Sequence, residues 1–269
     1  MNTINSISLS GLFGKYSLHW NLHPDVNILV GVNGSGKTTI LRCLDALLSG
    51  NFSLLKQRSI EIAITLADGL TIAYKGKAIP IPNIKHEYIT TFDVPLRKTP
   101  NRDETPLDKE LQRTLYALGS NQKSFSGYRL KATNSPEEAQ TVNRRIQKLF
   151  ALINELCAET DKTIEINREN NSIVFRHADE IIPLGRLSSG EKQLLVILFT
   201  VFLMEEEPCL LLTDEPEISL HIGWQQRFID VLYEVNPSLQ LLIATHSPSI
   251  FGEGWGDKIF FTEDLINPL

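Results

Sequence analysis

The 269-residue chain is long enough for one large domain or two small ones, and 42% hydrophobic residues can form a sizeable core. Its formal net charge of −6 argues against a protein whose whole surface binds polyanions. The longest uncharged apolar run, Leu194–Met204, is well short of the roughly 20 residues that span a bilayer. No secretory signal or disulfide framework is evident, so we expect a cytoplasmic protein without a membrane segment.

The N-terminal segment, residues 1–95, predicts part of an αβ lobe. Alternating apolar and polar residues predict an antiparallel hairpin that turns near Gly14. Val26–Val30 is a continuous apolar run, which is typical of a strand buried on both faces of a parallel sheet. A helical pattern of leucines then ends at Gly50, and Asp68–Gly69 indicates the turn of a second hairpin. A further strand is predicted over Tyr88–Phe92.

Residues 96–186 predict an inserted, mostly helical lobe. Two helices are expected over Leu107–Leu118 and Pro136–Cys157, with a polar loop between them. Short strands should follow over Ile164–Ile166, Ile173–Phe175 and Ile181–Leu184. From Arg97 to Lys148 there are eleven Lys or Arg against six Asp or Glu, so this region carries +5 and the rest −11.

From residue 187 to 269 the αβ pattern resumes. The expected elements are a helix over Gly190–Met204, a strand over Cys209–Thr213, a helix over Leu220–Val235, a strand over Leu239–Ala244 and a last strand over Lys258–Phe261. Strands that alternate with helices imply parallel crossovers and helices on both faces of a sheet. The sequence therefore predicts an α/β fold with a parallel-sheet core, N-terminal antiparallel strands and a mostly helical inserted lobe.

A glycine-rich loop, GVNGSGKT, separates the predicted strand at Val26–Val30 from the following helix and fits the pattern GxxxxGK[ST]. Its backbone N–H groups and the helix N-terminus suit phosphates. Lys37 is expected to reach the β and γ phosphates of ATP, and Thr38 to hold Mg²⁺. A plain glycine-rich turn is disfavoured by this strand-to-helix context. The predicted binding residues here are Gly31, Asn33, Gly34, Ser35, Gly36, Lys37, Thr38 and Thr39.

Asp214 and Glu215 follow the apolar run Cys209–Thr213 at the carboxyl end of a predicted strand, where open αβ sheets bind ligands. We expect Asp214 to support Mg²⁺, directly or through water, and Glu215 to orient and deprotonate the attacking water. Alone, such a pair would be better explained as helix-capping acids. Together with the glycine-rich loop, it predicts hydrolysis of ATP to ADP and phosphate.

Three segments resemble motifs of ABC-class ATPases from the chromosome-maintenance and DNA-repair branch, the SMC, RecF and OLD-like proteins. RLSSGEKQ at 186–193 resembles the signature, LLLTDEPEISLH at 210–221 the Walker B motif and D-loop, and ATHSP at 244–248 the switch histidine. The resemblance implies an ABC ATPase head with a P-loop core. It also implies that Ser188 and Gly190, with Ser189 between them, bind the γ phosphate of an ATP held by a second subunit.

His246 would then contact the γ phosphate within its own subunit and join Glu215 and Lys37 as the catalytic residues. From the residues alone, the segment 188–190 is also explained as a helix N-cap, and a histidine after a buried strand is more often structural. Ser189 departs from the common signature, which has a second glycine there. His221 replaces the D-loop aspartate. Asp93 occupies the place of the glutamine loop, and we assign it to the metal site with Thr38 and Asp214.

The segment between Asp93 and Arg186 lacks sustained heptads, which excludes long coiled-coil arms. LFG near the start, TFDVP and DEPEISLH are similar to ATPases of bacterial anti-phage systems such as Septu, retron-associated and OLD proteins. We therefore predict an ATPase whose two copies sandwich ATP and Mg²⁺ and regulate a separate effector, a nuclease or toxin.

The alternative hypothesis is an ATP-regulated nucleic-acid-binding protein of DNA repair or maintenance. It rests on the basic region 97–148, although a solvated charged face explains the same pattern. A transporter subunit is disfavoured because the signature is not LSGGQ and no membrane segment is expected.

Overall fold

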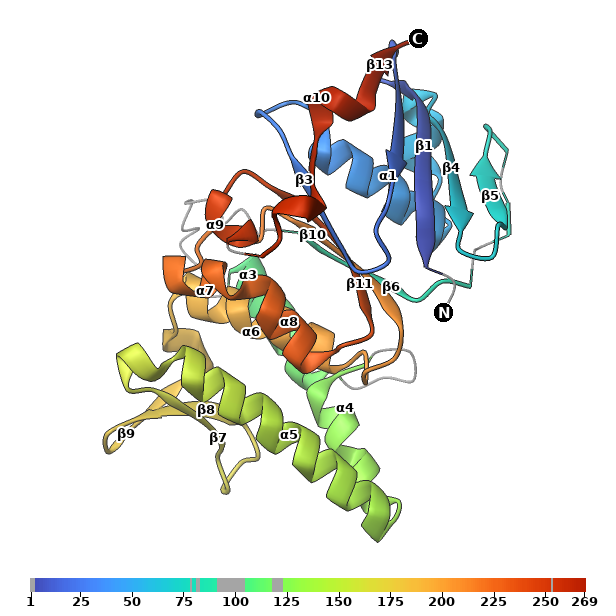
Figure 1. The fold of residues 1–269 in the computed structure, drawn as a ribbon. Coiled ribbons are helices and arrows are strands. Elements are labelled where there is room, and N and C mark those ends of the chain that lie inside the picture. The colour runs from blue at the N-terminus through green and yellow to red at the C-terminus, as the bar shows by residue number, and fades with distance from the viewer. Residues whose placement is uncertain (1–2, 78, 81–82, 91–104, 118–122, 253) are drawn as a thin grey trace.

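The computed structural model describes residues 3–77, 79–80, 83–90, 105–117, 123–252 and 254–269 (Figure 1). Its centre is a five-stranded parallel sheet. In spatial order the strands are β12 (Ile259–Phe261), β3 (Val26–Val30), β11 (Leu239–Thr245), β10 (Cys209–Asp214) and β6 (His86–Thr90). Every residue of β10 and β11 is buried, because helices cover one face and a helix with a second sheet covers the other. The predicted parallel core is confirmed.

A five-stranded antiparallel sheet forms the N-terminal layer. Its order is β13 (Ile266–Pro268), β2 (Tyr16–Asn21), β1 (Ile4–Leu12), β4 (Glu61–Leu66) and β5 (Thr71–Tyr74). Both predicted hairpins are confirmed. The first turns through Phe13 and Gly14 with φ of 52° and 75°, and the second through Gly69 with φ of 86°. Asp68 stabilises the second turn by accepting a 2.9 Å hydrogen bond from Leu70 N.

Helix α1 (Lys37–Ser49) packs between the two large sheets, and the short α2 (Ser53–Arg58) follows it. Leu41 and Leu44 of α1 share a hydrophobic cluster with Leu9 of β1 and with Leu210 and Leu212 of β10. The side chain of Leu211, which points to the other face of β10, belongs to a second cluster. Leucines that alternate along one strand therefore join both halves of the molecule.

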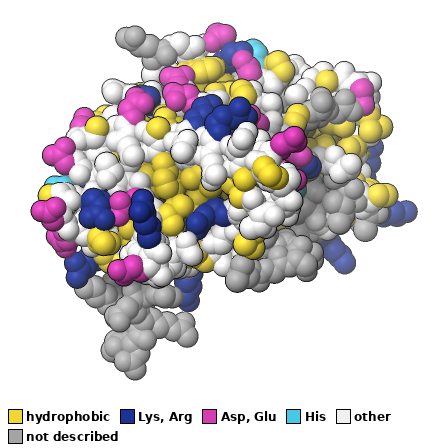
Figure 2. All heavy atoms as spheres, turned by 90° about the horizontal axis from the view of Figure 1, so that it is seen from below, with side chains coloured by type: hydrophobic (Ala, Val, Ile, Leu, Met, Phe, Trp, Pro, Cys, Tyr) yellow, Lys and Arg dark blue, Asp and Glu magenta, His cyan; other side chains and the backbone are white. Residues whose placement is uncertain are grey.

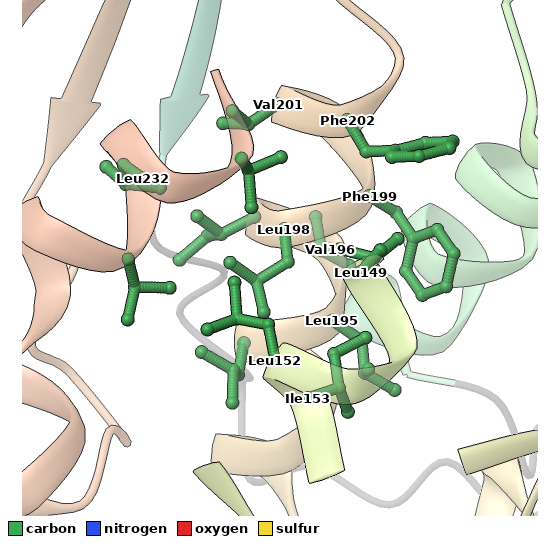
Figure 3. Close-up of a cluster of buried hydrophobic side chains, with 14 of the residues drawn as sticks. Leu149, Leu152, Ile153, Leu195, Val196, Leu198, Phe199, Val201, Phe202 and Leu232 are labelled. Atoms are coloured by element: carbon green, nitrogen blue, oxygen red, sulfur yellow. The ribbon is translucent and has the colours of Figure 1, made fainter. Parts of the chain in front are cut away.

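The second cluster contains most of the helices. These are α3 (Pro106–Tyr116), α4 (Phe125–Leu130), α5 (Pro136–Leu156), α6 (Ser189–Phe202), α7 (Ile222–Gln226), α8 (Phe228–Val235) and α9 (Pro248–Phe251). Figure 3 shows Leu152 of α5 facing Leu198 of α6, with Leu232 of α8 beside them. Helix α6 is buried on nearly all sides, so its long apolar run is a core helix. No helix among the described residues is long and apolar enough to cross a membrane.

A three-stranded antiparallel sheet lies beside α5 and has the order β7 (Thr163–Ile166), β8 (Ile173–His177) and β9 (Glu180–Pro183). The remaining elements are the 3₁₀ turns η1 (Lys131–Thr133), η2 (Ala158–Thr160), η3 (Leu184–Arg186) and η4 (Gly256–Lys258), and the helix α10 (Thr262–Leu265). The helices of residues 106–156 share their core with α6 and α8. The division of the chain at 96 and 186 stays a prediction.

Three expectations were wrong in detail. The polar loop expected between the two inserted helices contains α4, because Phe125 is 1% exposed and packs edge-on against Phe199. The helix expected over Leu220–Val235 is divided into α7 and α8 at Arg227, where φ is −101°. The expected last strand does not close the chain, because α10 and β13 follow it and β13 pairs with β2.

Candidate ATP-binding site

The glycine-rich loop joins the carboxyl end of β3 to α1. Gly34 and Gly36 have φ of 82° and 102°, a backbone conformation that glycine adopts without strain. Gly36 is the N-cap of α1 and has no side chain that could accept a hydrogen bond from the first N–H groups of the helix. The first backbone N–H groups of this helix therefore remain available to an anion. Beside them lies a cavity of about 410 Å³. Its lining residues are Phe13, Asn33, Gly34, Gly36, Lys37, Thr38, Thr39, Glu215 and His246.

Gly31 and Ser35, also predicted to bind the nucleotide, are not among the described residues that line this cavity. A Cβ atom on Gly31 would lie 1.8 Å from Thr262 Oγ1 and 2.7 Å from Ser35 Oγ. The Thr262 hydroxyl is fully buried and lies 3.1 Å from Val30 O and 3.0 Å from Ser35 Oγ. Thr262 thus ties the start of α10 to the back of the loop. Nothing in the sequence signals this contact, because the partners are 227 residues apart.

Lys37 is the first residue of α1 and is 4% exposed. Its ammonium donates to Gly31 O at 2.9 Å and lies 2.6 Å from His246 Nε2. A charged ammonium can only donate, so His246 Nε2 is the acceptor and its proton resides on Nδ1. Burial lowers the pKa of Lys37, and the charges of Glu215, Asp214 and Glu217 oppose that shift.

The same Nε2 atom of His246 lies 3.4 Å from Glu215 Oε1. Because one nitrogen cannot both accept from Lys37 and donate to Glu215, we assign the hydrogen bond to the shorter contact. The cation of Lys37, the carboxylate of Glu215 and a neutral imidazole therefore meet at one edge of the cavity.

Asp214 ends β10 and is 7% exposed. The Thr38 hydroxyl donates to Asp214 Oδ1 at 3.0 Å, and the Tyr88 hydroxyl lies 3.4 Å from Oδ2. Burial raises the pKa of Asp214, although these hydrogen bonds and the charges of Arg42 and Lys37 oppose the shift. Tyr88 was not foreseen, because a tyrosine in a strand gives no sign of which carboxylate it meets.

The chemistry of Thr38 and Asp214 fits Mg²⁺. Magnesium is usually bound through one or two carboxylates together with substrate phosphates and water, not by a complete protein cage. The described residues contain no group of three or more His, Cys, Asp or Glu side chains arranged for a metal ion. Asp93, the third residue expected at the metal site, lies outside the described residues.

Glu215 lies in a left-handed backbone conformation, with φ of 49°. This conformation costs a residue other than glycine about 1–3 kcal/mol and persists where the surrounding structure enforces it. Here the backbone N–H donates to Ala244 O at 2.8 Å, and Ile218 N bonds back to Glu215 O. The tight turn aims the Glu215 carboxylate into the cavity.

Glu217, in the same turn, was missed by the sequence analysis. It contacts the segment that carries His246, and it lines a second cavity of about 610 Å³ with Val32 and Ile218. This cavity shares Asn33, Glu215 and His246 with the first, so the two form one open site. The motif DEPE contained the signal, since a second acid follows the Asp214–Glu215 pair.

Ser188 is the N-cap of α6, as expected from the residues. Its Oγ accepts from Glu191 N, while Glu191 Oε2 accepts from both N and Oγ of Ser188 at 2.8 Å. A Cβ atom on Gly190 would lie 2.2 Å from Ser219 O, so glycine is required for this close approach. The residues that line the Lys37 cavity do not include Ser188, Ser189 or Gly190. Within the described part of the chain, residues 188–190 therefore lie away from the cavity beside Lys37.

The basic region is partly neutralised. Lys131 pairs with Glu205 at 2.6 Å, and Arg145 pairs with Glu206 at 3.2 Å. On the face seen in Figure 2, the described Lys and Arg side chains lie among Asp and Glu side chains. For the described part of the region, these ion pairs favour a solvated charged face, while Arg97, Lys98 and Arg102 lie outside the described residues.

The fold is similar to that of SMC heads. An SMC head bound to the C-terminal winged-helix domain of ScpA superposes with a TM-score of 0.61 at 15% identity, over 99% of this chain and 97% of that chain. The SMC head with an extended coiled coil from a Pyrococcus furiosus complex superposes with a TM-score of 0.57 at 14% identity, over 100% of this chain and 96% of that chain. Stu0660 of Streptococcus thermophilus superposes with a TM-score of 0.55 at 12% identity, over 98% of this chain and 76% of that chain. At these identities the likeness shows the fold.

The chain belongs to the AAA ATPase domain family (AAA_15), whose model matches residues 83–251. It is also 23% identical to the Septu protein PtuA of Bacillus thuringiensis over 290 residues, which covers 92% of this chain and 72% of PtuA. The predicted resemblance to SMC-type ATPases and to Septu is thereby confirmed.

Proposed function

We propose that the protein binds ATP with Mg²⁺ and hydrolyses it. The observation that carries the proposal is the meeting of Lys37, Glu215 and His246 in one cavity beside the uncapped start of α1. Within this site Lys37 and the loop N–H groups bind phosphates, and Thr38 and Asp214 hold Mg²⁺. When bound, the metal ion neutralises charge on the phosphate oxygens.

The Glu215 carboxylate takes the role of general base. It faces the cavity and lies close to His246, so it can accept a proton from a water molecule held beside the γ phosphate. The His246 imidazole accepts from Lys37 at Nε2, so contact with a phosphate oxygen requires the ring to turn its N–H toward that oxygen.

The active form in this proposal is a dimer that holds ATP between two copies. Apolar side chains at the rim of the site are exposed, with Val32 at 65%, Phe13 at 49% and Ile218 at 39%. Ser188 and Gly190 are absent from the described lining of their own chain's cavity. A second copy that covers the rim would bury the apolar groups and supply the signature.

We further propose that the dimer regulates a separate effector, a nuclease or toxin, in anti-phage defence. This part rests on the similarity to the Septu protein PtuA. Coexpression with the product of the adjacent gene tests it. A complex whose assembly or effector activity changes with ATP would support the proposal, and an effector unaffected by the ATPase would contradict it.

The Glu215→Gln variant tests the hydrolytic role. Because a general base contributes roughly 10² to 10⁴ in rate, kcat should fall by that factor while ATP still binds. Size-exclusion chromatography with light scattering should show an ATP-dependent dimer that persists. Glu234→Gln, at an exposed acid of α8, is the matched control and should leave turnover unchanged. Wild-type turnover in Glu215→Gln would remove the assignment of the base.

A further inference from the structure

One carboxylate oxygen of Glu217 accepts three hydrogen bonds from the segment that carries His246. Oε1 of Glu217 lies 2.7 Å from Thr245 Oγ1, 2.8 Å from the backbone N of His246 and 3.1 Å from the backbone N of Ser247. Two of the donors are backbone amides directly at the functional residue. Hydrogen bonds to an ionised acceptor are among the stronger ones in proteins, so this contact fixes the course of the main chain there.

A second link between the same two segments comes from Gln225 of α7. Its side-chain amide donates to Leu220 O at 2.9 Å and to Glu217 O at 3.3 Å, and its carbonyl accepts from Ser247 Oγ at 2.8 Å. The turn after β10 and the segment after β11 are therefore held together on two sides.

The simplest alternative is that Glu217 is an acid that caps its own turn. The geometry does not favour it, because the three donors lie 28–30 residues further along the chain, at the end of the neighbouring strand. Moreover, Glu217 Oε2 is buried and has no hydrogen-bond partner among the described residues. An unsatisfied buried carboxylate oxygen is costly, which is typical of groups kept for a functional reason.

We propose that Glu217 is a positioning residue for ATP hydrolysis: it holds the main chain at His246 so that the imidazole faces Lys37 and Glu215. This inference rests on the proposed ATPase function. Glu215 and Glu217 belong to one turn, so a single rigid unit sets both the base and the histidine. Loss of the Glu217 acceptor would leave the His246 amide without this bond, reduce Ser247 N to its 2.9 Å bond with Thr245 Oγ1, and allow the imidazole to move.

Kinetics of Glu217 variants test the inference. A displacement of about 1 Å can cost on the order of 10²-fold, so Glu217→Ala should lower kcat by about 10- to 100-fold. The dissociation constant for ATP, measured by calorimetry, should change by less than about 3-fold because the phosphate loop is intact. Glu217→Gln keeps the acceptor oxygen and should retain kcat within about 5-fold. Equal losses in Glu217→Gln and Glu217→Ala would overturn the inference.

A double-mutant cycle with His246→Ala separates positioning from a general structural role. If Glu217 acts through the histidine, Glu217→Ala should lower kcat by less than about 2-fold when His246 is already alanine. A loss as large as in the wild-type background would contradict the inference. Glu234→Ala, which removes an exposed acid of α8, is the control and should leave every measurement at the wild-type value.

Hydrogen exchange provides a readout that does not need hydrolysis. The amide of His246 should lose protection in Glu217→Ala by about 10-fold or more and keep it in Glu217→Gln. If the wild-type protein failed to hydrolyse ATP, the proposed function would fail while this measurement still tested the contact. Unchanged protection in Glu217→Ala would show that Glu217 does not hold the segment.

Discussion

The N-termini of α1 and α6 carry two of the predicted phosphate-binding motifs, yet they are built in opposite ways. Helix α1 begins after Gly36, with no acid in its first turn and no side-chain cap among the described residues. Helix α6 begins with a capping box in which Ser188 and Glu191 satisfy each other's backbone N–H groups. The start of α1 is therefore open to an anion, whereas at α6 the carboxylate of Glu191 lies beside the N-cap and adds negative charge there.

A serine and a glycine at the start of a helix therefore do not by themselves make its N-terminus a phosphate-binding site. At α6 the Glu191 carboxylate accepts from the backbone N and the hydroxyl of Ser188, and Lys162 pairs with it at 2.6 Å. For Ser188 to contact ATP of a second subunit, as we propose, its hydroxyl has to exchange the bond to Glu191 for one to phosphate.

The largest effect is expected from replacing Lys37 at the start of α1, compared with Lys192, the buried lysine at the start of α6. Lys37→Met should lower kcat/KM by about 10²- to 10³-fold, because it removes a cation from the phosphate site. Lys192, in the first turn of α6, pairs with Asp108 of α3 at 2.7 Å. Lys192→Met should retain activity within about 5-fold but lower the free energy of unfolding by about 3 kcal/mol, since Asp108 loses its partner. Steady-state hydrolysis and urea unfolding measure both. The reverse pattern would show that the α6 start is the phosphate site.

The second-largest effect is expected from adding a side chain at Gly190, which lies close to the backbone oxygen of Ser219. In Gly190→Ala the added Cβ would meet a backbone oxygen at 2.2 Å, so the turn that carries Glu215 must shift. We expect a loss of about 1–3 kcal/mol in the free energy of unfolding, measured by urea titration, together with slower ATP hydrolysis. Gly185→Ala is the matched control, because no described heavy atom lies within 4 Å of its Cβ position. Comparable stability of the two variants would mean that the contact with Ser219 is loose.

The smallest effect is the pH dependence of the stability that the capping box of α6 contributes. Burial alone would raise the pKa of Glu191, but hydrogen bonds from Lys162 and Ser188 outweigh it and hold the pKa below the ordinary 4.5. The native state thus binds fewer protons than the unfolded chain, so the stabilisation is complete above pH 4.5 and is lost as pH falls through the folded pKa. Glu191→Gln should cost about 1–2 kcal/mol at neutral pH, and the difference from wild type should vanish in acid. A constant difference across pH would contradict the charged cap.

The sequence predicted the local elements of the site well. The strand at Val26–Val30, the phosphate loop and Asp214–Glu215 were found because each is a contiguous run whose chemistry requires a fixed spacing. The helix α4 was missed because it has only six residues, and packing of Phe125 against Phe199 stabilises it. Sequence reasoning also could not foresee β13, which forms only because β2 offers a free edge.

The sequence by itself thus determined the fold class, the nucleotide-binding loop and the two acids at the end of β10. Only the tertiary structure decided how these parts are held. Examples are Glu217 beneath His246, Thr262 behind Gly31, and Ser219 against Gly190. The physical reason is that each of these contacts joins segments brought together by parallel crossovers. Their partners follow from the packing of the sheet and have no fixed spacing that a sequence pattern could reveal.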